Sequence, residues 1–394
     1  MSLISIDEPV SAPHGGAAWA LGFRPFYLGA SVYAALAMPL WIGKYLGWWT
    51  GLAHVDALWH MHEMVFGMAL AVVVGFLYTA ARNWTGQWTP RGGHLMALFG
   101  LWLAGRVAML VDASALAIAI DVAFLPCAAW PLLQVMRASG NRRNYFLPAL
   151  LMVLAMLNLA FHAARFGALQ VSPVSLAQAA IFIIVVIESV IGTRVIPMFT
   201  RNGAPGANPL VVTRRDRLGL ALMAAAAAAW LLPVPALVQS TLAAGAAALI
   251  FVRLAGWQPQ ATLRVPLLWI LHLSYAWIGI GFALLALAAH GIVTPSTAFH
   301  ALTVGSMAGL IIGMMTRTTL GHTGRMLKAG RPEVRMYVLI QAGAVLRLLA
   351  GVQAGLVRDT ALTLAALAWT AAFALFAIHY GPYLLAPRID GKEG

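Results

Sequence analysis

Long apolar segments follow one another along almost the whole chain, and this feature restricts its fold more than any other. A typical segment is FGMALAVVVGFLYTAA, at residues 66–81. Charged residues make up only 9% of the 394 residues, whereas soluble domains carry roughly 25%. Because an α-helix needs about 20 apolar residues to cross a bilayer, the sequence predicts an all-α, polytopic membrane protein rather than several soluble domains.

The apolar segments predict about twelve transmembrane helices. Together they form a single membrane domain, residues 27–385, between an N-terminal segment, 1–26, and a C-terminal tail, 386–394. Only Pro233 and Pro235 mark the break between the seventh and eighth spans. The predicted spans cover residues 27–43, 58–80, 93–111, 114–136, 144–164, 174–198, 216–234, 236–255, 266–289, 297–319, 333–351 and 360–385.

The positions of the basic residues predict the orientation in the membrane. Of the 25 lysines and arginines, only Lys44, Arg165 and Arg358 fall in loops on the side opposite the termini, and Arg106 and Arg347 lie within spans. Lysine and arginine are enriched on the cytoplasmic side of membrane proteins, so both termini are expected there. The net charge of +13 therefore reflects contact with the lipid bilayer, and no nucleic-acid partner is expected.

The chain has one cysteine, Cys127, so it has no internal disulfide. It has neither a CxxC nor a CxxCH motif. These absences argue against a zinc ribbon, an iron–sulfur cluster and covalently attached haem.

All of the 11 histidines except His14 fall near one or the other predicted membrane face. A histidine at the edge of a span can simply meet water, but six on one face favour a site, since neutral imidazole binds iron, copper and zinc and haem iron accepts histidine axially. The predicted outer layer holds His54, His60, His62, His162, His290 and His300, and the inner layer holds His94, His272, His322 and His379.

Two of the outer histidines lie in WHMHEMVFG, residues 59–67, where the second predicted span begins. On an α-helix His60 and Glu63 share a face, whereas His62 points about 200° away from His60. The two histidines are therefore expected to have different roles. Glu63 and Glu188, which lies within the sixth predicted span, are candidate proton carriers, because a carboxylate inside a membrane is usually functional.

An internal match relates the second predicted span to the tenth. HEMVFGMALAVVVGFLYTAARNWTG, residues 62–86, aligns with HALTVGSMAGLIIGMMTRTTLGHTG, residues 300–324, and pairs His62 with His300. The sixth span is a weaker third copy, which predicts three repeats of four helices. In that arrangement the glycines of these spans allow close helix contact or leave room for a flat ligand, and His62 and His300 face a common axis.

Arginines gather at the predicted inner ends of the same spans. They can anchor the protein in the membrane or pair with the propionates of a haem, because the planar guanidinium recognises carboxylates well. The candidates are Arg24, Arg82, Arg194, Arg201, Arg317 and Arg325.

Several of these segments resemble the NnrS family of bacterial inner-membrane proteins. The similar segments are FRPFYL (23–28), WHMHEMVFG (59–67), GFLYTAARNWTG (75–86), RVIPMFTRNG (194–203), LHLSYAW (271–277) and HALTVGSMAGLIIGMMTRTTLGHTGR (300–325). The resemblance implies a twelve-span protein of nitric oxide metabolism that carries haem and copper. It marks as signature positions His60, His62, Glu63, His272, His300, Arg317, His322 and Arg325.

From the residues and the resemblance together we expect a protein of the bacterial inner membrane that binds nitric oxide and reduces or otherwise removes it. The expected cofactors are a non-covalent, b-type haem and copper, and reduction also needs an electron donor, which the sequence does not identify. The candidate metal ligands are His60, His62, His162, His272, His300 and His322. The alternatives are a transporter of a small anion or metal, and a haem-containing nitric oxide sensor without turnover.

Overall fold

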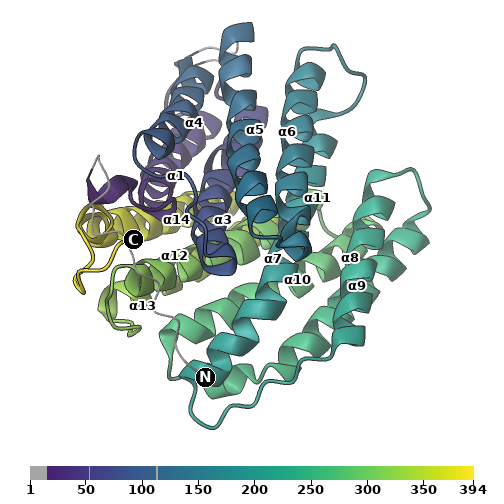
Figure 1. Ribbon diagram of the computed structural model, residues 1–394. Helices are drawn as coiled ribbons and strands as arrows, with labels where there is room; N and C mark the ends of the chain where they lie inside the picture. Colours follow the sequence, from purple (N-terminus) through teal and green to yellow (C-terminus); the bar gives the residue numbers. More distant parts are fainter. Residues whose placement is uncertain (1–15, 53, 112–113) are drawn as a thin grey trace.

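The computed structural model describes residues 16–52, 54–111 and 114–394, and His14 lies outside these ranges. Within them the chain folds into helices joined by short loops, with no strand (Figure 1). The helices are α1 (Phe23–Tyr45), α2 (Ala57–His62), α3 (Leu70–Thr85), α4 (Gly93–Val111), α5 (Ala115–Ala138), α6 (Phe146–Arg165), α7 (Pro173–Gly203), α8 (Thr213–Leu231), α9 (Ala236–Gly256), α10 (Pro266–Ala288), α11 (Pro295–His300), α12 (Gly309–His322), α13 (Arg331–Val352) and α14 (Gly355–Leu385). Short 3-10 turns occur at Ala17–Trp19, Arg142–Asn144 and Pro259–Thr262.

Eleven helical segments of the described residues are long and apolar enough to span a membrane. This confirms an all-α, multi-pass membrane protein. The remaining predicted span, residues 216–234, is also a helix, α8, but its first turn carries Arg214, Arg215, Asp216 and Arg217. Charged side chains are unfavourable in the bilayer core. With four of them, α8 is not apolar enough to count among the eleven candidate spans. The predicted break at the two prolines is correct, since α8 ends at Leu231 and α9 begins at Ala236.

The second and tenth spans share an unusual construction. In each, a six-residue α-helix that ends in a histidine leads into a π-helical segment, η2 (Glu63–Ala69) or η5 (Ala301–Ala308), and then into a longer α-helix. The N-cap residues, Asp56 and Thr294, also correspond in the alignment, and each accepts a hydrogen bond from the backbone three residues later. The structure therefore supports the internal match between these two spans. The sixth span, α7, is an uninterrupted α-helix, so it does not share this feature.

Glycines in these spans allow neighbouring helices to approach closely. A Cβ atom on Gly75 would lie 2.9 Å from the Cβ atom of Phe26, and one on Gly305 would lie 2.5 Å from the ring of Trp277. The glycines were expected either to allow close helix contact or to leave room for a flat ligand. At Gly75 and Gly305 aromatic side chains fill the space, so the structure shows close helix contact.

The two ends of the domain pack together, with α14 beside α1 (Figure 1). Arg24, at the start of α1, is 1% exposed and donates hydrogen bonds to the carbonyl oxygens of Leu384 (2.9 Å), Ala386 (2.8 Å) and Gly394 (2.6 Å). Farther along the same pair of helices, the indole of Trp369 donates to the carbonyl of Ala34 (3.1 Å). Arg24 therefore ties the first helix to the C-terminal tail.

Candidate functional site

A buried polar network lies between the second predicted span and its neighbours. At its centre Arg106, on α4, donates to Glu63 Oε2 through Nη1 (2.6 Å) and to Asp121 Oδ1 through Nη2. All three side chains are almost fully buried, at 3%, 0% and 3% exposure. Gly67 makes room for this arrangement, since a Cβ atom there would lie 2.5 Å from Arg106 Nη1. Buried ionic groups need such partners, because an unpaired charge inside a protein is strongly destabilising.

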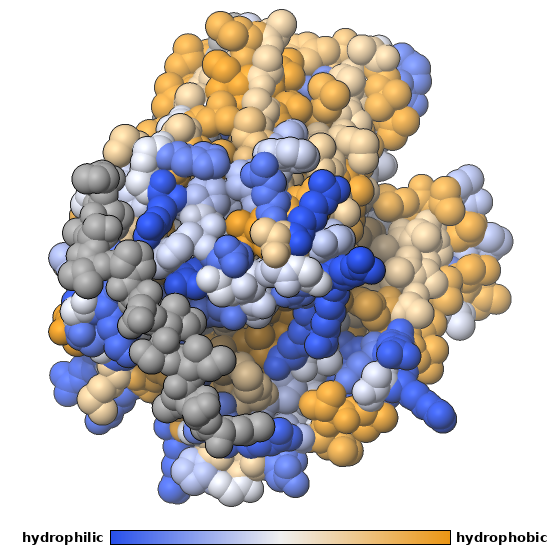
Figure 2. Space-filling model, viewed as in Figure 1, coloured by the Kyte–Doolittle hydropathy of each residue, from blue (hydrophilic) through white to orange (hydrophobic). Residues whose placement is uncertain are grey.

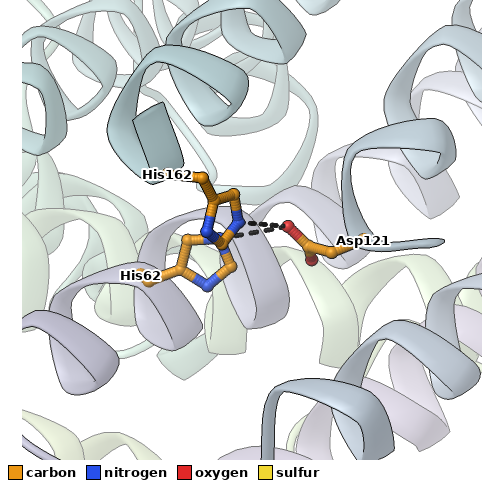
Figure 3. A group of neighbouring side chains, drawn as sticks. All are labelled: His62, Asp121 and His162. Atoms are coloured by element: carbon orange, nitrogen blue, oxygen red, sulfur yellow. Dashed lines mark hydrogen bonds and ion pairs between the residues drawn. The ribbon is translucent and has the colours of Figure 1, made fainter. Parts of the chain in front are cut away.

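Two histidines join the network at Asp121. His62 Nε2 and His162 Nε2 each lie 3.1 Å from Asp121 Oδ2, and the two rings are 4.7 Å apart. Figure 3 shows both imidazoles turned toward the same carboxylate. One ligand atom from each of the three residues lies within 4.8 Å of the other two, which is a spacing that could hold a metal ion. The three side chains come from α2, α5 and α6, so only the packing of these helices brings them together.

Further polar side chains fix the orientation of this cluster. Asn158 donates to Asp121 Oδ2 (2.8 Å), and its amide oxygen lies 2.8 Å from His62 Nε2. The other ring nitrogen of His62 contacts Glu63 Oε1 (2.8 Å), and Tyr33 donates its hydroxyl to Glu63 Oε2. Both nitrogens of His62 thus face oxygen acceptors. An imidazolium would satisfy this ring, and so would a metal ion bound at Nε2.

The charges of the network also suit a cation. Glu63 and Asp121 carry two negative charges when ionised and Arg106 carries one positive charge, so one negative charge is uncompensated while both imidazoles are neutral. In addition, His162 Nδ1 is buried without a hydrogen-bond partner. A cavity of about 10 Å³, roughly the size of one water molecule, adjoins the two imidazoles and is lined by His54, Trp59, His62, Met109, His162 and Arg165.

A second group of side chains surrounds His60 and His300. His60 stacks on Trp41, with ring centroids 5.0 Å apart and planes at 6°. His300 contacts the carbonyl oxygen of Ser296 through Nδ1 (2.7 Å). Arg347 donates to Ser296 Oγ (3.0 Å), and its charge acts on both imidazoles. Because a carbonyl can only accept, His300 Nδ1 carries the proton and Nε2 of the neutral ring is the available ligand atom.

The structure separates the histidines differently from the expected arrangement. We expected His62 and His300 to face a common axis, but His62 turns to Asp121, and it is His60 that lies within electrostatic range of His300. His60 and His62 point to different residues, Trp41 and Asp121 respectively, and their different roles stay a prediction. However, Glu63 contacts its neighbour His62 (2.8 Å), whereas α-helical spacing predicts that it shares a face with His60.

The other candidate residues lie in separate surroundings. Glu188, on α7, accepts a hydrogen bond from Ser306 of η5 (3.0 Å). His272 Nε2 lies 2.8 Å from the Thr200 hydroxyl, whereas His322 packs on Phe23, with ring centroids 5.7 Å apart. His272 and His322 therefore contact different residues from those around the outer histidines.

The six candidate arginines do not converge on one site. Five of them lie over aromatic rings: Arg24 over Phe23 (5.5 Å), Arg82 over Trp88 (4.1 Å), Arg194 over Phe146 (6.0 Å), Arg317 over Phe199 (3.7 Å) and Arg325 over Tyr383 (3.8 Å). Arg24 is engaged by the C-terminal carbonyls. Only Arg194 and Arg201 line the same cavity.

Four residues of the buried network were not predicted as site residues: Tyr33, Arg106, Asp121 and Asn158. For two of them the sequence contains a usable signal, because Arg106 and Asp121 are charged residues inside apolar segments, where such residues are costly and usually functional. Tyr33 and Asn158 give no comparable signal, since uncharged polar residues are common in spans.

Comparison with known protein families shows one match. Residues 17–388 match the family model described as NnrS protein. Among curated proteins, none matches the chain.

Proposed function

The chain belongs to the NnrS family, and from this premise we propose that it is a metal- and haem-containing protein of the bacterial inner membrane that binds nitric oxide and removes it by reduction. Such an activity would relieve nitrosative stress. Reduction of two nitric oxide molecules takes two electrons and two protons and gives nitrous oxide and water. The protein must therefore combine a metal site, a source of protons and contact with an electron donor.

The observation that carries this proposal is the buried cluster of His62, Asp121 and His162. Two ligand atoms that lie about 2.1 Å from one ion, at angles of 90–110°, are roughly 3.0–3.4 Å apart. The 3.1 Å separations between each imidazole nitrogen and the Asp121 oxygen agree with that range. Imidazole and carboxylate together suit iron or copper. The three residues would hold such an ion, and the adjoining cavity, about the size of one water molecule, would have to widen to admit nitric oxide.

His60 and His300 are the proposed ligands for haem. The Nδ1–H of His300 is bonded to a backbone carbonyl (2.7 Å), which is the usual way in which a metal-binding histidine is oriented. His60 Nδ1 is buried without a partner. Arg347, which donates to Ser296 Oγ (3.0 Å) in the same turn as His300, would pair with a carboxylate of the haem. When bound, haem supplies an iron that exchanges single electrons.

The carboxylate and hydroxyl side chains around the cluster would hold the protons. Glu63 lies between His62 and Arg106 and accepts a hydrogen bond from Tyr33. These contacts hold the carboxylate next to a proposed metal ligand, where it would pass protons toward the substrate. The deep burial of Glu63 and Asp121 would also exclude bulk water, so proton delivery would depend on these side chains.

The proposal is tested by measuring metal, haem and activity separately. We expect purified wild-type protein to contain one non-haem metal ion, to show the Soret band of haem, and to consume nitric oxide steadily with an electron donor. The variants His62→Ala, His162→Ala and Asp121→Asn should lose the non-haem metal and the activity but retain the Soret band. The variants His60→Ala and His300→Ala should lose the Soret band and retain the metal.

His290→Ala is the matched control, because His290 is exposed and contacts only Ser240 (3.0 Å). The proposal fails if wild-type protein contains neither haem nor metal, or if the His62 and His162 variants consume nitric oxide normally.

A metal transporter is the second candidate, because three ligands inside a helical bundle could also bind an ion in transit. A transporter would release the ion on dilution into metal-free buffer and would carry it into vesicles. A resident cofactor would instead remain bound through purification. Steady consumption of nitric oxide would separate an enzyme from a sensor that binds the gas without turnover.

A further inference from the structure

A second cavity, distinct from the metal cluster, opens between α7, α8 and α9. Its volume is about 500 Å³, and no histidine lies among its lining residues. Along α7 it extends from Ser189 to Arg201, a helical distance of roughly 18 Å. In the view of Figure 2, hydrophilic residues gather between the apolar surface over α4, α5 and α6 and the apolar surface over α8 and α9.

The deep end of this cavity is electrically balanced. Arg253 is 1% exposed and donates to Asp216 Oδ1 (3.0 Å), Ser189 Oγ (2.9 Å) and the Tyr275 hydroxyl (2.6 Å). Arg253 and Asp216 neutralise each other. This pair lines the bottom of the cavity and has no net charge with which to attract a ligand.

The rest of the cavity is strongly positive. Arg143, Arg194, Arg201 and Arg217 line it, and within the described part of the chain none of the four forms an ion pair. Arg194 donates to the neutral oxygen of Asn144 (3.0 Å), and Arg201 donates to the carbonyl of Pro209 (3.3 Å). Arg143 lies near enough to Arg194 for their like charges to repel. Three of the four are exposed and Arg194 is half-buried, so the space between them is open to an anion and carries a positive field that attracts one.

We propose that this cavity binds a phosphate group, carried by an anionic phospholipid or free as inorganic phosphate. Guanidinium groups bind tetrahedral oxyanions with paired hydrogen bonds, and four of them can surround one phosphate. The rim of the cavity includes Met198 and Val211, which are 47% and 46% exposed, so a lipid could keep its acyl chains against apolar surface. By the predicted orientation the site opens on the cytoplasmic side, where basic pockets between helices bind lipid headgroups.

Two binding measurements on the purified full-length protein test this and identify the source of the phosphate. Native mass spectrometry measures retention of phosphatidylglycerol and cardiolipin, compared with zwitterionic phosphatidylcholine. Equilibrium dialysis with radiolabelled inorganic phosphate measures binding of the free ion to delipidated protein. Preference for the anionic lipids supports a headgroup site, and binding of inorganic phosphate supports a free-anion site.

The double variant Arg194→Gln/Arg201→Gln should weaken binding about 100-fold, since each charge-assisted interaction contributes roughly tenfold. Arg217→Gln, at an exposed position, should weaken it about tenfold and should fold normally. Arg142→Gln is the matched control, because Arg142 is exposed beside Arg143 but does not line the cavity; it should leave binding unchanged.

The proposal is overturned if wild-type protein binds neither the anionic lipids nor phosphate, or if Arg142→Gln weakens binding as much as the double variant does. It is also overturned if the double variant loses the Soret band and keeps its phosphate binding, which would assign these arginines to haem propionates. A wild-type protein that lacks haem and metal but binds phosphate would leave this site intact and contradict only the proposed function.

Discussion

Arg106 shows how one residue can decide whether a buried site is stable. It is the cation that lies between Glu63 and Asp121, and all three are shielded from solvent. Removing one partner of a buried ion pair costs more than removing both, because the remaining charge stays uncompensated. The carboxylates that orient His62 and His162 therefore depend on this arginine, although it is not itself a metal ligand.

We predict that Arg106→Met lowers the free energy of unfolding by roughly 3–5 kcal/mol. Denaturant titration of the detergent-solubilised protein measures the change. The double variant Arg106→Met/Glu63→Gln should recover part of this loss, because it also removes one of the two carboxylates that Arg106→Met leaves without an ion-pair partner. If the double variant were less stable than the single one, the carboxylate would not be the cause.

If His62, Asp121 and His162 hold the proposed metal ion, its removal should destabilise the protein. A ligand present at 100 times its dissociation constant stabilises the folded state by about 2.7 kcal/mol. A membrane-permeable chelator should therefore lower the melting temperature of the wild-type protein. The chelator should have no effect on His62→Ala, which lacks a ligand from the start, and an equal effect on both proteins would place the metal elsewhere.

At the scale of elements, the two π-helical segments are the feature that sets the direction of the histidines. Each π-helical turn holds more residues than an α-helical turn, so the short helices α2 and α11 are rotated relative to α3 and α12. His62 faces Asp121 of α5 and Asn158 of α6, while His60 stacks on Trp41 of α1. These segments also occur at corresponding places in the second and tenth spans, which an alignment of residues alone cannot reveal.

Deletion of one residue from a π-helical segment should convert it to an α-helix and rotate the histidine that precedes it by about 100°. Deletion of Met64 should abolish binding of the non-haem metal, while the helical circular dichroism stays unchanged. Deletion of Leu302, the corresponding position in η5, should instead abolish the Soret band and spare the metal. The same loss in both variants would indicate general misfolding and would contradict separate roles for the two segments.

At the scale of the whole molecule, the predicted orientation places the His62–Asp121–His162 cluster, His60 and His300 near the outer face, and the arginine-lined cavity near the inner face. Nitric oxide is small, uncharged and soluble in lipid, so it needs no wide channel to reach a buried cluster. A charged phosphate cannot cross the bilayer core in this way. It would reach the protein only from the aqueous side or as part of a lipid headgroup, and the arginine-lined cavity lies at that predicted inner face.

Cysteine labelling can test this orientation. In a Cys127→Ser background, Ala168→Cys should react with a membrane-impermeant maleimide in intact spheroplasts. Pro205→Cys should react only after permeabilisation. Both positions are exposed in loops, so a difference in reactivity reports the side of the membrane. The reverse pattern would invert the predicted topology.

The sequence by itself determined the class of the protein, the positions of nearly all its spans and the match between the second and tenth. Hydropathy and helix length are local properties, so they can be read along the chain. The sequence also supplied His62 and His162 as candidate ligands. Helix geometry along the chain also placed His60 and His62 on different faces. Only the tertiary structure brought His62 and His162 to Asp121, because such contacts depend on how distant helices pack.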